Sequence, residues 1–237
     1  MGRIFETRKA TMFKRYAKMA KAFTKIGRDI VIAVKLGGPH PESNPRLRMV
    51  IQNAKAVNMP KANVESAIKR ASEKDSSNYE EVVYEGYAPY GVPVLVECTT
   101  NNPTRTVASV RMYFSRASGA LGTNGSVSFM FEHIVLFKIE AGNLNKDDLE
   151  LELIDFGLED INYDEEHKQY IIQVQFVDFG KMQSALEERK INVIETSKTY
   201  IPTTTKELPP DQEAEVMAMI EKMEEDDDIQ AVYHNLA

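Results

Sequence analysis

Five cations recur near the start of the chain at steps of four, three, four and three residues: Lys14, Lys18, Lys21, Lys25 and Arg28. This spacing places them on one face of an α-helix, over about 21 Å at 1.5 Å per residue. The stripe suits a phosphate backbone, because each phosphate that a cation neutralises releases condensed counterions. The pattern therefore predicts polyanion binding that is strong at low salt and largely independent of base sequence.

The alternative interpretation of these lysines is a solvated helix face. Such faces usually carry Glu four residues from Lys, whereas Glu6 is the only acidic residue before Asp29. We therefore favour binding. The further candidate contacts are cations beside the stripe and on the second expected helix: Arg3, Arg8, Lys9, Arg15, Arg46, Arg48 and Lys55. Phe13 and Phe23 have the chemistry to stack on bases, but aromatic residues at helical spacing are usually core, and we expect them there.

The two parts of the chain carry opposite charge. Residues 1–74 hold 17 basic and 5 acidic side chains, a net of +12. Residues 75–237 hold 12 and 31, a net of −19, which leaves −7 for the whole chain. This separation predicts a polyanion-binding domain joined to domains with another task.

Three helices are expected to position the cations, in a domain over residues 1–78. The first has an apolar face that should be buried: Tyr16, Met19, Phe23, Ile26, Ile30 and Ala33. Prolines mark the starts of the second and third helices, at Asn44-Pro45 and Met59-Pro60. An organelle transit peptide is also basic and acid-poor, but this start holds little Ser and its helical pattern continues to Val34, so we expect residues 1–35 to belong to the mature protein.

Beyond residue 78 the patterns predict an α+β architecture with one domain inserted into another. The outer domain, 79–133 plus 199–237, should contain two β-α-β units: Val92–Thr99, Thr104–Ala117 and Ser126–Phe131, then Tyr200–Thr205, Pro209–Glu224 and Ile229–Leu236. The inserted domain, 134–198, should have the ferredoxin-like order β-α-β-β-α-β: Ile134–Ile139, Lys146–Phe156, Leu158–Tyr163, Tyr170–Phe176, Phe179–Arg189 and Ile191–Glu195.

Catalytic and metal-binding patterns are weak in this sequence. Its four histidines are scattered, and the single cysteine, Cys98, falls within an expected strand, where a buried thiol is the usual state. The acidic run Glu224–Asp228 lacks the alternating ligands of a calcium loop and is expected to be a solvated turn. We therefore expect no enzyme activity, no cofactor and no metal. The low cysteine content and the lack of a long apolar run favour a cytoplasmic protein without a membrane segment.

Several separate motifs, in order along nearly the whole chain, resemble the YebC/PmpR family. They are Phe23-Thr24-Lys25, Asn44-Pro45-Arg46-Leu47-Arg48, Asn58-Met59-Pro60-Lys61, Ala67-Ile68-Lys69, Tyr84-Glu85-Gly86-Tyr87 and Gly125-Ser126-Val127-Ser128-Phe129-Met130-Phe131. The resemblance implies three lobes and a regulator of transcription that binds promoter DNA through a positively charged surface. The start, Gly2-Arg3-Ile4-Phe5-Glu6, differs from the Gly-His-Ser-Lys-Trp run usual in the family, so no role of that His or Trp is carried over.

Two other functions stay open at this point. Mitochondrial members of the family are translational activators of cytochrome oxidase, and bacterial members have been connected with ribosomes and stalled translation. The resemblance therefore also implies a ribosome-associated factor that binds ribosomal RNA. A protein-interaction adaptor is the third possibility, and it would apply if neither nucleic acid bound.

Overall fold

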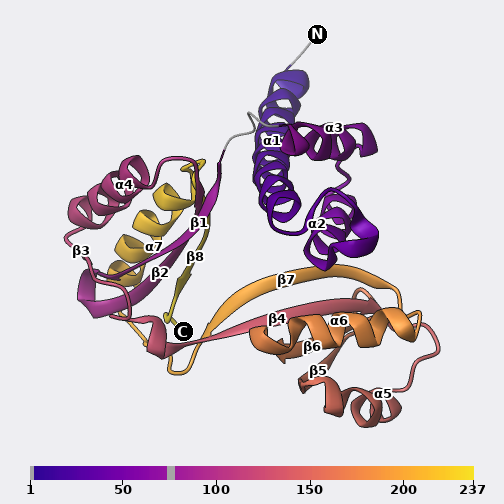
Figure 1. Ribbon diagram of the computed structural model, residues 1–237. Helices are drawn as coiled ribbons and strands as arrows, with labels where there is room; N and C mark the ends of the chain where they lie inside the picture. The colour runs from indigo at the N-terminus through magenta and orange to yellow at the C-terminus, as the bar shows by residue number, and fades with distance from the viewer. Residues whose placement is uncertain (1–2, 74–77) are drawn as a thin grey trace. The chain divides into compact units, whose positions relative to one another are not determined.

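The computed structural model of this 237-residue protein describes the backbone of residues 3–73 and 78–237, and the side chains from residue 19 onward within those ranges. The chain forms two compact units, Met1–Tyr79 and Glu80–Ala237. Figure 1 shows the elements of each unit. The first unit is entirely helical in its described part, and the second holds two four-stranded sheets.

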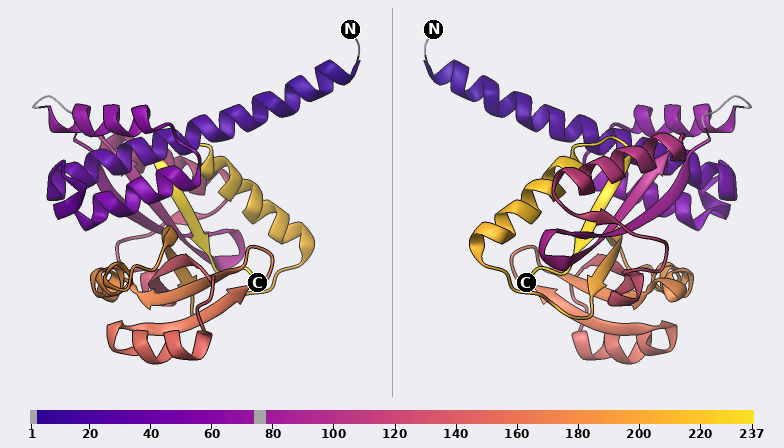
Figure 2. Two further views of the ribbon diagram at one scale, coloured as in Figure 1. Left: turned by 90° about the vertical axis from the view of Figure 1, so that its right-hand side faces the viewer. Right: turned by 90° about the vertical axis from the view of Figure 1, so that its left-hand side faces the viewer.

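The first unit contains the three helices that the sequence predicts. They are α1 (Arg3–Gly37), α2 (Pro45–Ala56) and α3 (Lys61–Ser72), with a short 3-10 turn, η1 (Pro41–Ser43), between α1 and α2. Figure 2 shows α1 as one long continuous helix. Its end is marked by Gly38, whose φ of 84° suits glycine and whose N–H bonds to the carbonyl of Val34 at 2.8 Å.

The core of this unit agrees with the predicted apolar faces at most positions. Its buried side chains come from all three helices: Ile26, Ile30 and Ala33 of α1, Leu47, Val50 and Ala54 of α2, and Val64, Ala67 and Ala71 of α3. Met19 and Phe23 differ from the prediction, because Met19 is exposed and Phe23 is only partly buried. Tyr16 and Phe13 lie outside the described side chains.

The first sheet of the second unit is antiparallel, with strand order β3-β1-β2-β8. Its strands are β1 (Glu80–Ala88), β2 (Val92–Thr100), β3 (Ala120–Leu121) and β8 (Ile229–His234). Helices α4 (Pro103–Arg116) and α7 (Pro210–Glu224) contribute Val110, Phe114, Val216 and Ile220 to a core shared with β2 and β8. The 3-10 turn η2 (Pro89–Gly91) joins β1 to β2.

In each of the two β-α-β units predicted for this region, the helix and one strand are confirmed, and the other strand is wrong. Ser126–Phe131 forms mainly the 3-10 turn η3 (Ser128–Met130), because the carboxylate of Glu85 takes backbone N–H groups that a strand would need for its ladder. Tyr200–Thr205 is not a separate strand, because Tyr200 continues a long strand of the second sheet. The sequence interpretation also missed β1, which pairs with β2 along its whole length.

The second sheet confirms the predicted β-α-β-β-α-β order and is antiparallel, with strand order β5-β6-β4-β7. Its elements are β4 (Phe131–Glu140), α5 (Lys146–Leu153), η4 (Ile154–Phe156), β5 (Leu158–Asp164), β6 (Gln169–Gln175), η5 (Phe176–Asp178), α6 (Phe179–Glu188) and β7 (Val193–Pro202). Alternate residues of β4 and β6, among them Phe137 and Ile172, pack against Leu153 of α5 and Met182 of α6.

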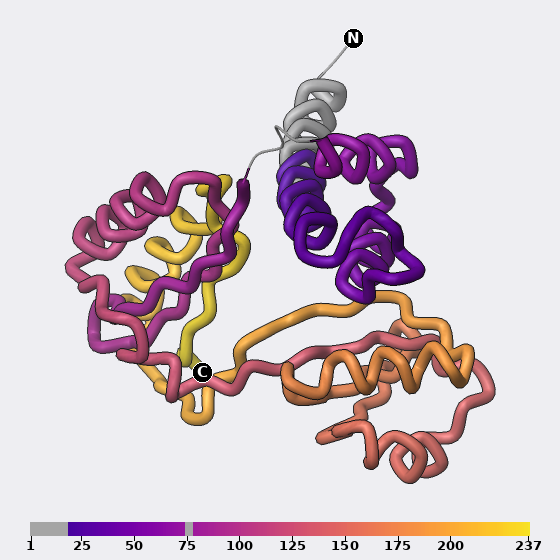
Figure 3. The backbone as a smooth tube through the Cα atoms, in the orientation of Figure 1, coloured from indigo at the N-terminus to yellow at the C-terminus, as the bar shows by residue number. Residues whose placement is uncertain are grey.

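The fold class is therefore α+β, as predicted, and β4 and β7 carry the chain between the two sheets of the second unit (Figure 3). The predicted boundaries at 133/134 and 198/199 stay a prediction. Cys98 is buried, as expected. Among the described residues, no helix is long and apolar enough to cross a membrane.

Candidate nucleic-acid interface

Half of the predicted contact residues can be located in the structure. The side chains of Arg3, Arg8, Lys9, Lys14, Arg15 and Lys18 lie outside the described residues, although their backbone belongs to α1. Lys21, Lys25 and Arg28 are on the described part of α1, and Arg46, Arg48 and Lys55 are on α2. None of the six is buried.

The α1 cations lie away from the buried side of the helix. At 100° per residue, Lys21, Lys25 and Arg28 fall roughly opposite the buried Ile26 and Ile30. Arg28 also contacts the segment that follows α3, because its guanidinium lies over the Tyr79 ring at 5.3 Å from the centroid. Seven residues further along α1, about two helical turns, Lys35 donates to Oδ1 of Asn78 at 2.5 Å. The cationic side of α1 is thus linked to the chain that leaves this unit.

The α2 cations have different surroundings. Arg48 donates from Nη1 to the carbonyls of Pro41 and Glu42, at 2.8 and 3.0 Å, so it holds the turn between α1 and α2. This structural role is enough to account for an arginine at that position. Lys55 is exposed in the last turn of α2, and Arg46 is partly exposed in the first.

One buried side chain, Asn44, sets the turn that orients α2 against α1. Its Nδ2 donates to the carbonyls of Ala33 and Gly38, at 2.7 and 2.8 Å, and its Oδ1 accepts from the N–H of Leu47 at 3.0 Å. The last bond is the N-cap of α2. A Cβ at Gly37 would lie 2.6 Å from Cγ of Asn44, so glycine is required there.

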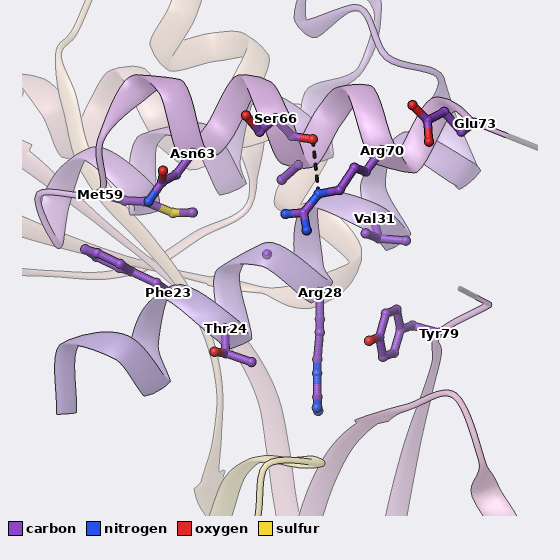
Figure 4. A pocket seen from close by; sticks show the side chains of 12 residues that line it. Phe23, Thr24, Arg28, Val31, Met59, Asn63, Ser66, Arg70, Glu73 and Tyr79 are labelled. Atoms are coloured by element: carbon purple, nitrogen blue, oxygen red, sulfur yellow. Dashed lines mark hydrogen bonds between the residues drawn. The ribbon is translucent and has the colours of Figure 1, made fainter. Parts of the chain in front are cut away.

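A cavity of about 740 Å³ lies between α1 and α3 (Figure 4). From α1 it is lined by Phe23, Thr24, Gly27, Arg28 and Val31, and from the rest of the unit by Met59, Asn63, Ser66, Ala67, Arg70, Glu73 and Tyr79. Figure 4 shows Phe23 and Met59 near one end and Arg70 extending from α3 toward α1. Nε of Arg70 donates to the carbonyl of Ser66 at 3.3 Å.

Of the six predicted contact residues whose side chains the structure describes, the cavity includes only Arg28. Sequence interpretation missed Asn63, Ser66 and Tyr79 as site residues, since none of them belongs to a charged or repeating pattern. Gly27 could have indicated the cavity, because it is a glycine inside a pattern that otherwise favours a helix. Phe23, expected in the core, lies in the cavity wall instead.

In the second unit, one buried carboxylate forms hydrogen bonds that connect elements of that unit. Asp228 was expected in a solvated turn but is buried, and its Oδ2 accepts from Thr100, Thr106 and Arg105 at 3.2, 2.9 and 2.7 Å. Among the described residues, no three His, Cys, Asp or Glu side chains are grouped so that they could hold a metal ion.

Two family models match the chain. One, described as the TACO1/YebC protein N-terminal domain, matches residues 3–74, and the other, the TACO1/YebC second and third domain, matches residues 79–236. A "Probable transcriptional regulatory protein" of Cytophaga hutchinsonii is 53% identical over 237 residues, covering 100% of this chain and 99% of its own. A protein of the same name from Anaeromyxobacter dehalogenans is 52% identical over 240 residues, with full coverage of both.

A solved structure also resembles this fold closely. The crystal structure of a conserved hypothetical protein from Aquifex aeolicus superposes with a TM-score of 0.77 at 36% sequence identity. The match covers 93% of this chain and 91% of that one.

Proposed function

Because this chain belongs to the TACO1/YebC family, we propose that it regulates transcription by binding DNA through the cations of its first unit. Its relatives named as probable transcriptional regulatory proteins match it along its full length, so the comparison includes the basic unit as well as the sheets. In this proposal the protein binds DNA and catalyses no reaction.

The observation that carries this proposal is the placement of charge. The net of +12 in residues 1–74 belongs to the helical unit, and Lys21, Lys25 and Lys55 project from it with partly or fully exposed side chains. Lysine side chains on an accessible helical surface contact phosphates without reading bases. Binding through them should therefore weaken steeply with salt.

The test compares two triple variants that remove equal charge from different units. Lys21, Lys25 and Lys55 are changed to Gln in one, and the exposed Lys168, Lys190 and Lys222 of the second unit in the other. If the first set makes three phosphate contacts, its log–log salt slope on duplex DNA should fall by roughly 2 to 3 units. The second set should leave the slope unchanged. Equal slopes in the two variants would exclude this surface as the contact.

Sequence preference is tested with three polymers: a duplex selected by the protein from genomic promoter fragments, a shuffled duplex of equal composition, and a ribosomal RNA fragment. Transcriptional control requires tighter binding to the selected duplex, because phosphate contacts carry no base information. Equal binding to both duplexes would contradict it, and preference for the ribosomal RNA would favour a role in translation.

A further inference from the structure

The cavity between α1 and α3 has a glycine in its wall that the helix does not need. Gly27 lies inside α1, where its backbone is helical, and a Cβ built on it would meet no atom within 4 Å. Neither backbone conformation nor packing within the described structure therefore requires glycine. Glycine inside a helix lowers its stability relative to alanine, so open space at this position comes at the expense of the helix.

The rest of the wall combines three kinds of chemistry. Phe23 and Met59 provide an apolar, partly aromatic surface near one end (Figure 4). Thr24, Asn63 and Ser66 provide hydroxyl and amide groups that are exposed to solvent. Arg28 and Arg70 provide cations, and the bond from Nε of Arg70 to Ser66 fixes how its guanidinium projects from α3.

From this combination, and resting on the proposed function, we infer that the cavity binds one unpaired nucleotide of a single-stranded nucleic acid. The base lies against Phe23, with its polar edge toward Asn63 and Thr24, and the phosphate lies toward Arg70, whose side chain extends toward α1 in Figure 4. Aromatic stacking and cations along the backbone are the general means of binding single strands. The one carboxylate of the described wall, Glu73, lies apart from the guanidinium of Arg70 in Figure 4.

A paired base does not reach this site. In a duplex both faces of each base are stacked and its pairing edge is used, so a base must be turned out before an aromatic ring in a cavity can contact it. The cavity therefore adds affinity for single strands over duplexes, while the lysines of the first unit act on both. The same chemistry would also accept a free nucleotide, which the experiment below distinguishes.

The first test uses Gly27→Leu, which fills the cavity, with Gly180→Leu as its control. Gly180 lies in α6, and a Cβ there also meets no atom within 4 Å. Leucine favours helix, so neither variant should be less stable than wild type by circular dichroism on heating. On a labelled single strand of about 12 nucleotides, Gly27→Leu should bind roughly 10-fold more weakly, whereas its binding to the matching duplex stays unchanged. Gly180→Leu should bind both as wild type does.

The second test uses Arg70→Gln, which removes a cation that bonds only to its own helix turn in the described contacts. It should weaken single-strand binding several-fold and lower the salt slope by about 1 unit. Titration with AMP and UMP alone tests whether the ligand is a free nucleotide. Binding of AMP or UMP that depends on Gly27, without any binding of single strands, would overturn the single-strand assignment.

The outcomes separate this inference from the proposed function. If the protein binds duplex and single strands and Gly27→Leu changes neither, the cavity is not a nucleotide site but DNA binding through the lysines stands. If Gly27→Leu weakens single-strand and duplex binding equally, the cavity does not select unpaired bases. If wild type binds neither polymer nor free nucleotide, both proposals are wrong.

Discussion

The side chain of Asn44 connects α1, the turn that follows it and α2 through three hydrogen bonds. It caps α2 and also occupies carbonyls at the end of α1, so one buried amide fixes two helix ends. The sequence predicted that α2 starts at Asn44-Pro45, because proline is common in the first turn of a helix. The bonds back to Ala33 and Gly38 could not be predicted, since they depend on how the chain turns between the helices.

Replacement of Asn44 by Ala should cost about 2 to 4 kcal/mol, because a cap is lost and buried carbonyls are left without a donor. Asn102 provides the matched comparison: it caps α4 by accepting from the N–H of Arg105, but it is exposed. Asn102→Ala should cost only about 1 kcal/mol. Amide hydrogen exchange in α2 and α4, respectively, measures the two losses, and equal losses would show that the buried bonds add nothing.

At the scale of elements, helices were predicted better than the strands of the first sheet. Proline and asparagine mark the starts of α2 and α4, and these signals are local, so the predicted start of α2 and both predicted bounds of α4 agree with the structure within about two residues. The second sheet was also predicted, because its strands and helices alternate in clear patterns. The first sheet was not predicted. Its strand β8 comes from the far end of the sequence and pairs with β2, and no local signal shows such a pairing.

The turn after β3 shows why one predicted strand was wrong. Glu85 in β1 is buried, and its carboxylate accepts from the N–H groups of Gly125, Val127 and Ser128 at 2.7, 2.8 and 2.9 Å. Burial alone would raise the pKa of Glu85, but these backbone bonds outweigh it, and the pKa lies below the ordinary value of 4.5. A side chain from another element therefore decides the conformation of this segment.

Glu85→Gln should destabilise the first sheet by about 2 to 3 kcal/mol at neutral pH, because an amide NH₂ would face backbone donors. The lowered pKa means that the wild-type carboxylate stabilises the fold fully above about pH 4.5 and loses this effect as pH falls through its folded pKa. Hydrogen exchange in β1 and β2 should thus show wild type and variant converging in acid. Glu80→Gln, at an exposed position of the same strand, should change little at any pH. A constant gap between Glu85→Gln and wild type would contradict this account.

At the scale of the whole second unit, an aromatic stack lies between elements of its two sheets. His133 of β4 is stacked on Phe176 and Tyr200, at centroid distances of 4.0 and 4.3 Å, and Tyr200 meets Tyr233 of β8 edge-on at 5.1 Å. Nearby, Nζ of Lys198 lies 3.2 Å from carboxylates of both Glu81 and Glu97. These contacts join the ferredoxin-like sheet to the first sheet.

Burial lowers the pKa of His133 below 6.5, an effect that Lys198 adds to and Glu97 opposes. Between the folded pKa of His133 and about pH 6.5 the unfolded chain binds a proton that the folded chain does not, so the stability of this unit should rise as pH increases through that interval. His133→Phe keeps the stack and should reduce that rise by up to about 1 kcal/mol per pH unit. His133→Gln loses the stack and should be less stable even at neutral pH. Urea unfolding followed by tyrosine fluorescence provides the comparison, and an unchanged pH slope in His133→Phe would refute the assignment.

The pairing of β2 with β8 has a consequence for how the protein is made. All four strands of the ferredoxin-like sheet leave the ribosome before α7, so that sheet can fold while synthesis continues. β2 is synthesised much earlier than the β8 strand that covers its edge, and Val94 and Val96 share their core with side chains of α7 and β8, which are also synthesised late. During this interval a nascent chain presents an apolar strand with open hydrogen-bonding groups, which is the kind of surface that aggregates or recruits chaperones.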